Sequence, residues 1–194
     1  MALENLCYPC DLCCRKYKIY LFPNEAKAIA RKLKINYKDF VERYLDYYCE
    51  LFPYQPNMQT NFLELKYDNK KYFAFLCLSI KQKNNHCIFL KNRCCEIYSA
   101  RPLICRLFPD FKFYGEKFDF CKLDKQARKT EDPRIFYPHF TKYLKDIKQK
   151  GLRNTWKFLP EFSKENFWLL IDGNKTFVSD DFMELFVRYF KAIL

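Results

Sequence analysis

The chain has 194 residues, of which 49% are hydrophobic and 20% aromatic, so its length fits one domain, or one domain with a small appendage, and supplies ample material for a core. Its three glycines leave no glycine-rich phosphate loop, and neither the P-loop nor the dinucleotide-binding fingerprint occurs. The formal net charge of +12 favours acidic partners such as nucleic acid, an anionic membrane face or an acidic protein, while the alternative is a Lys-rich composition with charges spread over solvated faces.

The first feature in chain order is a cysteine loop, in which Cys7, Cys10, Cys13 and Cys14 are followed by Arg15. Two successive two-residue gaps are the spacing by which one short loop wraps a soft metal or an iron–sulfur cluster. The alternative is four unrelated core thiols, because free cysteine behaves as a small hydrophobe. Neighbouring side chains in extended chain point opposite ways, so Cys13 and Cys14 are not expected to hold one metal in the same manner.

After this loop the pattern predicts an extended run over 17–22 and then two helices. The first helix starts at Pro23 with Asn24 as its N-cap, and its apolar residues recur at helical spacing. The second starts at Asn36, carries Cys49 as a core thiol, and ends at the prolines that follow.

A β-hairpin follows these helices. Apolar and polar residues alternate over 62–67, and a more buried strand over 72–80 contains Cys77 as a core thiol. The turn between the two strands is polar, and residues 81–85 read as a polar loop.

The second cysteine block begins after that loop with Cys87, Cys94 and Cys95. We expect a short helix with Ser99 as its N-cap and Pro102 near its first turn, which stops before Pro109. This helix carries Cys105, flanked by Arg101 and Arg106, and one more cysteine, Cys121, stands further on.

The remaining elements are two hairpins and two helices. The hairpins are predicted over 111–120 and 167–178. A helical stretch that starts near residue 132 is expected to be interrupted or kinked at Pro138 and to stop at Gly151. The final amphipathic helix, capped by Ser179 and two acidic residues, runs to the end of the sequence.

Eleven cysteines decide the class of the protein. The first seven residues contain no basic stretch followed by an apolar one, so no secretory signal is expected, and no apolar run approaches the ~20 residues of a spanning helix. We therefore expect a cytoplasmic protein without a membrane span, in which clustered thiols are metal or redox sites rather than a disulfide framework.

The order of these motifs closely resembles the YkgJ-type CxxCxxCC family, whose domain is usually described as zinc- or iron-chelating. The resemblance covers roughly residues 5 to 122. It is carried by motif positions in both cysteine blocks: Cys7, Cys10, Cys13, Cys14, Arg15, Cys87, Phe89, Leu90, Cys95, Ile97, Tyr98, Arg101, Pro102, Cys105, Arg106, Phe108 and Pro109, with Cys121 where such proteins often carry one more cysteine.

Two positions depart from the family pattern. Leu12 stands where the family often has glycine, and Cys94 is an extra thiol beside Cys95, which leaves open which of the two ligates. The cysteine signature is also similar to that of flagellin lysine N-methylases, for which an iron–sulfur cluster and S-adenosylmethionine are implicated. Methyl transfer would come to this chain by analogy alone.

The resemblance implies a set of eight metal ligands, enough for two four-coordinate sites or for one [4Fe–4S] cluster with thiols to spare. The set is Cys7, Cys10, Cys13, Cys14, Cys87, Cys95, Cys105 and Cys121. The first three resemble the run that holds three corners of a [4Fe–4S] cluster, whereas zinc sites more often recur as separate two-cysteine hooks. We therefore favour an iron–sulfur cluster, with zinc as the alternative.

Two arginines are candidate cofactor-binding residues because they flank Cys105. Arg101 and Arg106 would neutralise a negatively charged cluster or bind a carboxylate or phosphate of a substrate, and the alternative is a structural ion pair. Tyr98 is expected to pack rather than to bond a cluster sulfur, His86 lies beside Cys87, and His139 reads as an ordinary surface or core residue.

These observations predict an α+β fold with a single compact domain, in which helices and small β-hairpins brace an irregular metal-bearing region. Residues 1–122 would form the cysteine-rich part and residues 123–194 a helical extension packed on it. The favoured function is electron transfer or a cluster-dependent reaction with an unknown redox or protein partner. The alternatives are a zinc-stabilised module that binds RNA or an acidic protein, and a metal carrier; whether the chain is an enzyme stays open.

Overall fold

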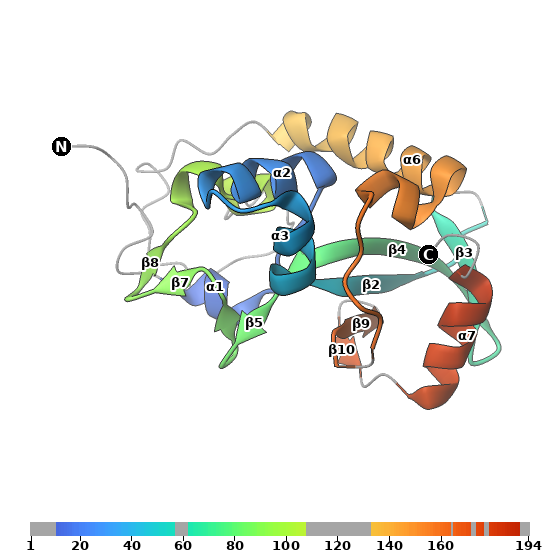
Figure 1. The fold of residues 1–194 in the computed structure, drawn as a ribbon. Helices are drawn as coiled ribbons and strands as arrows, with labels where there is room; N and C mark the ends of the chain where they lie inside the picture. The colour runs from blue at the N-terminus through green and yellow to red at the C-terminus, as the bar shows by residue number, and fades with distance from the viewer. Residues whose placement is uncertain are drawn as a thin grey trace.

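The computed structural model describes residues 11–56, 62–107, 133–163, 165–171, 174–176 and 179–190. Across these ranges the fold is α+β, as the sequence predicts, with helices packed around one mixed sheet (Figure 1). The hairpin expected over 111–120, together with Cys7, Cys10 and Cys121, lies outside the described residues. In the described ranges, no helix has both the length and the apolar character needed to cross a membrane.

The sheet is built around β4, which pairs with three other strands. The two edges of β4 differ, because β2 lies antiparallel along one of them while β1 and β3 follow one another along the opposite edge. β9 extends the sheet as the parallel neighbour of β2, and β10 closes it. The strands of the sheet are β1 (Tyr20–Leu21), β2 (Leu45–Pro53), β3 (Leu63–Tyr67), β4 (Lys70–Ile80), β9 (Phe167–Ile171) and β10 (Asn174–Thr176).

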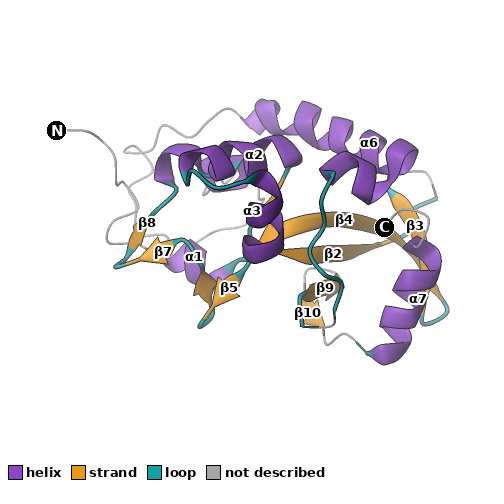
Figure 2. Cartoon of the chain, viewed as in Figure 1, coloured by secondary structure: helices purple, strands orange, loops and turns teal. Residues whose placement is uncertain are grey.

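Two small hairpins and a one-turn helix gather at the end of the molecule away from α7 (Figure 2). The hairpins are β5 (Gln82–Lys83) with β6 (His86–Cys87), and β7 (Leu90–Lys91) with β8 (Cys94–Cys95). The α-helices are α1 (Leu12–Lys16), α2 (Pro23–Lys32), α3 (Tyr37–Tyr44), α4 (Leu103–Leu107), α6 (Phe136–Trp156) and α7 (Asp180–Phe190), and 3-10 turns cover Tyr98–Ala100 and Pro133–Ile135.

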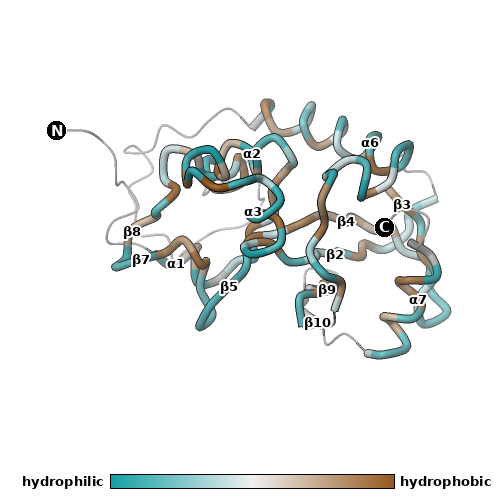
Figure 3. Tube along the Cα trace, in the orientation of Figure 1, coloured by the Kyte–Doolittle hydropathy of each residue, from teal (hydrophilic) through white to brown (hydrophobic). Residues whose placement is uncertain are grey.

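The sheet is covered on both faces, so successive residues of β2 enter different parts of the core. On one face, Phe75 contacts Tyr48 and also Phe140 of α6, with ring centroids 6.1 and 5.2 Å apart. On the other face, Tyr47 stacks with Phe167 at 6.3 Å. The chain is hydrophobic along the middle of β4 and hydrophilic at the turn between β5 and β6 (Figure 3).

Residues 45–53 form a strand, so the prediction that the second helix continues through Cys49 is wrong. That helix does start after Asn36, whose Oδ1 accepts a hydrogen bond from the Lys38 N–H at 2.8 Å, but it ends at Tyr44. A strand covered on both faces is apolar at consecutive positions, and such a run lacks the alternation that identifies a strand in sequence. Cys49 is fully buried between β4 and β9, which confirms it as a core thiol.

The hairpin predicted over 62–80 is confirmed, and the polar loop predicted over 81–85 is a second, smaller hairpin. Both turns use two residues with positive φ, Asp68 and Asn69 in the first and Asn84 and Asn85 in the second. Asn and Asp tolerate this left-handed conformation, and two-residue turns of this kind match the twist of paired strands. The polar residues that the sequence analysis assigned to a loop therefore form the turn of a hairpin.

Glu25 caps two helices with one carboxylate. Its Oε2 accepts a hydrogen bond from the Phe22 N–H at 2.6 Å at the start of α2, and its Oε1 accepts one from the Leu103 N–H at the start of α4. The N-cap of α2 is thus Phe22 and not Asn24, because Pro23 already occupies the first helical position that suits proline. Burial raises the pKa of Glu25, while these two backbone hydrogen bonds act in the opposite direction.

The helix that carries Cys105 also starts later than predicted. Ser99 lies in a separate 3-10 turn and is not the N-cap of α4, which begins at Leu103. The backbone carbonyl of Pro102 accepts hydrogen bonds from the N–H groups of Cys105 and Arg106 at 2.9 and 3.1 Å. The carboxylate of a distant residue thus replaces the local serine cap.

The long helix α6 is not interrupted at Pro138, contrary to the prediction. Pro138 lies in its first turn, where backbone N–H groups have no partner within the helix and proline is tolerated. The irregularity lies at Gly151, with φ 79° and ψ 168°, and a further turn continues to Trp156. The Trp156 indole N–H then donates to the buried Tyr143 hydroxyl at 3.1 Å.

The C-terminal predictions are confirmed within the described residues. β9 and β10 form the expected hairpin, and the Ser179 hydroxyl accepts a hydrogen bond from the Phe182 N–H at 3.1 Å at the start of α7. β9 also pairs with β2, so the last part of the chain contributes strands to the same sheet as the first.

We predict that Glu25→Ala destabilises the protein because both helices lose a cap at once. A helix cap is worth about 1 kcal/mol and a hydrogen bond to a charged group about 1.5–3 kcal/mol, so the free energy of unfolding should fall by about 2 kcal/mol or more in urea titrations. Glu42→Ala, on the exposed side of α3, is the control and should change it by less than about 0.5 kcal/mol. Equal losses in both variants would contradict the two-helix cap.

Candidate metal centre

Five of the predicted ligands line one cavity. It measures about 40 Å³, and its cysteines come from four elements, one of which lies far from the other three in the sequence. They are Cys13 and Cys14 of α1, Cys87 of β6, Cys95 of β8 and Cys105 of α4. The two cysteine blocks therefore converge on one site, called the cysteine cavity below.

The first two cysteines of the cavity lie on a helix and not in extended chain. Cys13 and Cys14 lie in the one-turn helix α1, so the expectation that they point opposite ways, as in extended chain, is wrong. Both line the cavity, and the Cys14 thiol hydrogen-bonds to Cys13. One turn of helix keeps neighbouring side chains within about a third of a turn, which lets both reach the same space.

The β7–β8 hairpin separates the adjacent thiols Cys94 and Cys95. Cys95 pairs with Leu90, and these two line the cavity, whereas Cys94 pairs with Lys91 and neither of these lines it. Successive strand residues point to opposite faces, so one thiol of the pair is directed inward. The structure thus distinguishes two positions that the sequence left equivalent.

The two arginines that flank Cys105 lie in different places. Arg101 lines the cysteine cavity, with its guanidinium 4.0 Å from the centre of the Tyr98 ring, so Tyr98 packs as expected. Arg106 instead lines a separate cavity of about 230 Å³ between α2 and α6, where its charge partly opposes the burial that raises the pKa of Glu25. Of the two, Arg101 alone is placed next to the thiols of the cysteine cavity.

Asp11 joins the two cysteine blocks and was missed by the sequence analysis. It is buried, with 7% of its surface exposed, and its Oδ2 lies 2.7 Å from Arg15 Nη2 and 4.0 Å from Arg93 Nε. Arg93 belongs to the β7–β8 turn, one residue before the second cysteine pair. The hydrogen bond from Arg15 lowers the pKa of Asp11, so the carboxylate stays charged. The available signal in the sequence was a single acidic residue between two of the predicted ligands, Cys10 and Cys13.

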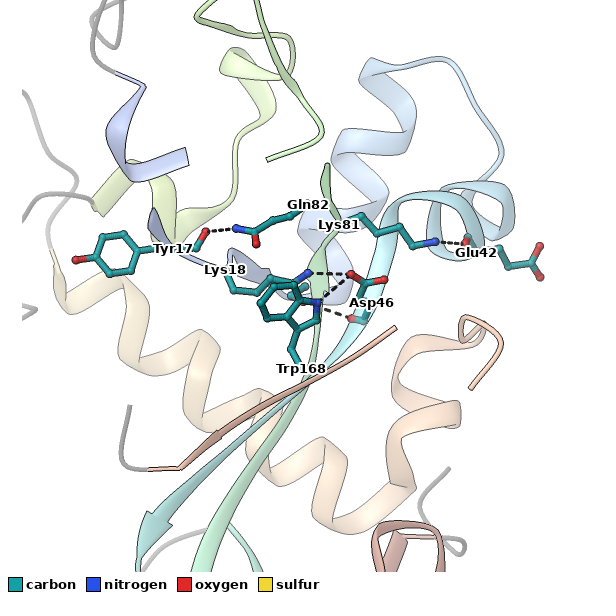
Figure 4. A network of polar contacts seen from close by, with 8 residues as sticks. Tyr17, Lys18, Glu42, Asp46, Lys81, Gln82 and Trp168 are labelled. Atoms are coloured by element: carbon teal, nitrogen blue, oxygen red, sulfur yellow. Dashed lines mark hydrogen bonds and ion pairs between the residues drawn. The ribbon is translucent and has the colours of Figure 1, made fainter. Parts of the chain in front are cut away.

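A polar network fixes the segment that follows α1 to the sheet (Figure 4). The Lys18 ammonium lies 2.8 Å from Asp46 Oδ2 and 4.0 Å from the centre of the Trp168 ring, and the Trp168 indole N–H donates to the same carboxylate at 3.2 Å. The Gln82 amide donates to the backbone carbonyl of Tyr17 at 3.1 Å. These contacts tie the first cysteine block to β2, β5 and β9.

The comparison with known families bears on this site. The model of the CxxCxxCC family, described as "Putative zinc- or iron-chelating domain", matches residues 6–132 of the chain. The chain belongs to the CxxCxxCC family. Neither the curated proteins nor the solved structures gave a match. The matched range contains all eight predicted ligands, so the family supports metal binding as the general role of these cysteines.

The donor set of this CxxCxxCC domain suits a thiophilic metal. All eight described cysteines are free thiols, and five of them line the cavity. Histidine contributes little, since the His86 ring nitrogen Nδ1 lies 3.0 Å from the Asn84 carbonyl oxygen and His139 is exposed on α6. Buried thiolates select zinc, copper(I) or iron–sulfur clusters over magnesium or calcium.

The thiols share the cavity without forming a coordination shell. Among the described residues, no group of three or more His, Cys, Asp or Glu side chains is placed so that it could hold a metal ion as it stands.

Three of the cavity thiols, those of Cys14, Cys87 and Cys105, have raised pKa values. Burial raises the pKa of Cys87 to about 12, with smaller contributions from the neighbouring Cys95 and Cys13. It also raises the pKa of Cys105, and the pKa of Cys14 is raised first by its hydrogen bond to Cys13 and then by burial. Since thiolates are the ligands, a metal must displace these protons, and its affinity should increase with pH.

We predict slow alkylation of Cys87 by iodoacetamide in metal-free protein at neutral pH. The folded-state pKa of about 12 lies above the ordinary value of 9.0, so the reactive thiolate stays scarce until the pH approaches the folded value. The rate should be followed by mass spectrometry of the Cys87 peptide over a pH series, with a short unfolded peptide of the same sequence as control. Equal rates for folded protein and peptide near pH 9 would contradict this.

Proposed function

We propose that this chain holds a [4Fe–4S] cluster on cysteines of the cysteine cavity and acts in electron transfer or a cluster-dependent reaction. The observation that carries the proposal is the convergence of five buried or half-buried thiols from four elements on one cavity. A [4Fe–4S] cluster needs four thiolates, and its usual ligand pattern combines a closely spaced run with a distant cysteine. Cys13 would come from such a run, and Cys105 from the distant block.

The surroundings of the cavity support a negatively charged group. Four thiolates give a cluster net negative charge, and Arg101 and Arg93, both of which line the cavity, offer positive charge beside it. The Asp11 carboxylate, the one acid in the described lining, is held by Arg15. We propose that Cys7, Cys10 and Cys121, outside the described residues, complete the ligand set together with the five cysteines of the cavity.

A single zinc ion is the second candidate, and the size of the cavity favours it. About 40 Å³ accommodates a few atoms of water size, which suits one ion with four thiolates better than a cube of iron and sulfide. In that case the cysteines would stabilise the fold, and the basic surface would be the place to seek an RNA or acidic protein partner.

The first test is metal and sulfide analysis of protein purified without oxygen. We expect about four iron and four acid-labile sulfide per chain, together with a broad visible absorption band, because a [4Fe–4S] cluster has that composition. Stoichiometric zinc without sulfide would replace the first candidate with the second. Protein that contains neither metal would contradict both.

The adjacent thiols provide a matched pair of variants. We predict that Cys95→Ser lowers the bound metal by at least about tenfold after dialysis against a chelator, since the loss of one ligand removes a strong metal–thiolate bond. Cys94→Ser, one residue away and outside the cavity, should retain the wild-type content. Equal metal contents in both variants would show that the inward direction of Cys95 does not reflect ligation.

A further inference from the structure

A second cavity shares a wall with the cysteine cavity. It measures about 310 Å³, and Cys13, Ile19 and Cys105 line both spaces. Its described lining is otherwise apolar and aromatic, apart from one acid and one lysine: Tyr17, Lys18, Tyr20, Tyr48, Glu50, Ile104 and Leu170. The volume is at the lower end of the range for small-molecule sites, which corresponds to a ligand about the size of one ring with a short side chain.

Glu50 is the acid in this lining. It lies on β2 two residues after Tyr48, so both side chains share one face of the sheet. The Tyr48 hydroxyl donates a hydrogen bond to Glu50 Oε2 at 2.7 Å. Among the residues that the structure describes, no cation forms an ion pair with Glu50, and no donor bonds its second carboxylate oxygen. Burial raises the pKa of Glu50, as expected for a carboxylate in apolar surroundings without a countercharge.

The lysine in the lining does not supply that countercharge. The Lys18 ammonium is directed to Asp46 Oδ2 at 2.8 Å and lies over the ring of Trp168, and 5% of its side chain is exposed (Figure 4). Its charge is therefore already matched by Asp46. Within the described part of the chain Glu50 therefore has no countercharge, and a positively charged ligand would supply one.

The walls suit a cation that carries an apolar body. The rings of Tyr20 and Tyr48 are 5.6 Å apart, and Ile104 and Leu170 supply aliphatic surface. Aromatic rings attract ammonium groups, and apolar walls bury hydrocarbon. Both kinds of contact are present within reach of the same carboxylate.

We propose that this cavity binds a small organic ammonium ion, a primary amine with one aromatic or short aliphatic body, with its charge on Glu50 and its body between Tyr20, Tyr48 and Leu170. The site is distinct from the cysteine cavity, and the proposal does not depend on which metal that cavity holds. Because Cys13 and Cys105 belong to the shared wall, the bound amine lies directly beside the thiols.

The test is calorimetric titration of the full-length protein with phenethylamine, and with benzyl alcohol and phenylacetate as neutral and anionic probes of similar size. We expect binding of the amine, affinity at least about tenfold weaker for the alcohol, and none for the anion, because a hydrogen-bonded charge pair of this kind is worth tenfold or more in affinity. Equal affinity for amine and alcohol, or no binding of the amine, would overturn the proposal.

Two variants locate the site. Glu50→Gln keeps the shape of the side chain and removes its charge, so it should weaken amine binding at least about tenfold while the melting temperature stays close to that of wild type. Glu64→Gln, an exposed position on β3 of the same sheet, should bind the amine as wild type does. Unchanged binding by Glu50→Gln would place the amine elsewhere and refute the assignment. Leu170→Phe, which fills the cavity, should also weaken binding, and unchanged affinity in this variant would likewise refute it.

Metal content, measured on the same samples, separates the two proposals. Glu50→Gln should keep the wild-type metal, and Cys95→Ser should keep amine binding, since Cys95 lines the cysteine cavity and not the second one. Loss of amine binding with metal intact implicates the second cavity alone. A chain that binds the amine but no metal refutes the metal proposal and leaves the amine site standing.

Discussion

The structure depends on one half-buried carboxylate that starts two helices. Glu25 satisfies backbone N–H groups of Phe22 and Leu103, and the second of these begins the helix that carries Cys105. Helix starts leave backbone donors without partners, and a buried helix start without an acceptor is destabilising. One side chain therefore positions a thiol of the second cysteine block relative to α2, which packs next to β1 through Phe22. The site is thus supported from the α2 side rather than by the cysteine motifs themselves.

Charged side chains also contribute to the convergence of the two cysteine blocks. Asp11 reaches from the first block to Arg93 in the turn that precedes Cys95, and Lys18 ties the following segment to Asp46 and Trp168. The Lys18–Asp46 pair is buried, with 5% and 10% of the two side chains exposed, so it is screened less by salt than a surface pair such as Asp11–Arg93, whose arginine is exposed. Polar contacts around the cysteine cavity thus help to bring thiols from the two blocks to one place.

How far the sequence predicts the molecule depends on whether the decisive interactions are local. The 62–80 hairpin was readable because apolar residues alternate and Asp68 and Asn69 suit its turn, and the family was readable because its cysteine motifs are short and ordered. The strand over 45–53 could not be recognised in the sequence, because a strand buried on both faces does not alternate apolar and polar residues. The inward direction of Cys95 comes from the short β7–β8 hairpin, which the sequence analysis did not predict. The side toward which Arg106 turns depends on α2 and α6, two elements far from it in the sequence. The cap that Glu25 provides to α2 could be recognised, because an acid at the third helical position is a capping signal. Its hydrogen bond to the start of α4 could not, because α4 lies far away in the sequence.

The parallel pair between β2 and β9 has a consequence for the order in which the chain assembles during synthesis. Residues 167–171 emerge from the ribosome long after residues 45–53, whereas every described residue of the cysteine cavity precedes residue 108. Closing so long a loop is slow relative to local pairing, and domains fold from the N-terminus as they emerge. We expect the thiols to gather while one edge of β2 still lacks its neighbour. Until β9 docks, that edge of β2 presents unpaired backbone N–H and C=O groups, which are a template for pairing with another chain.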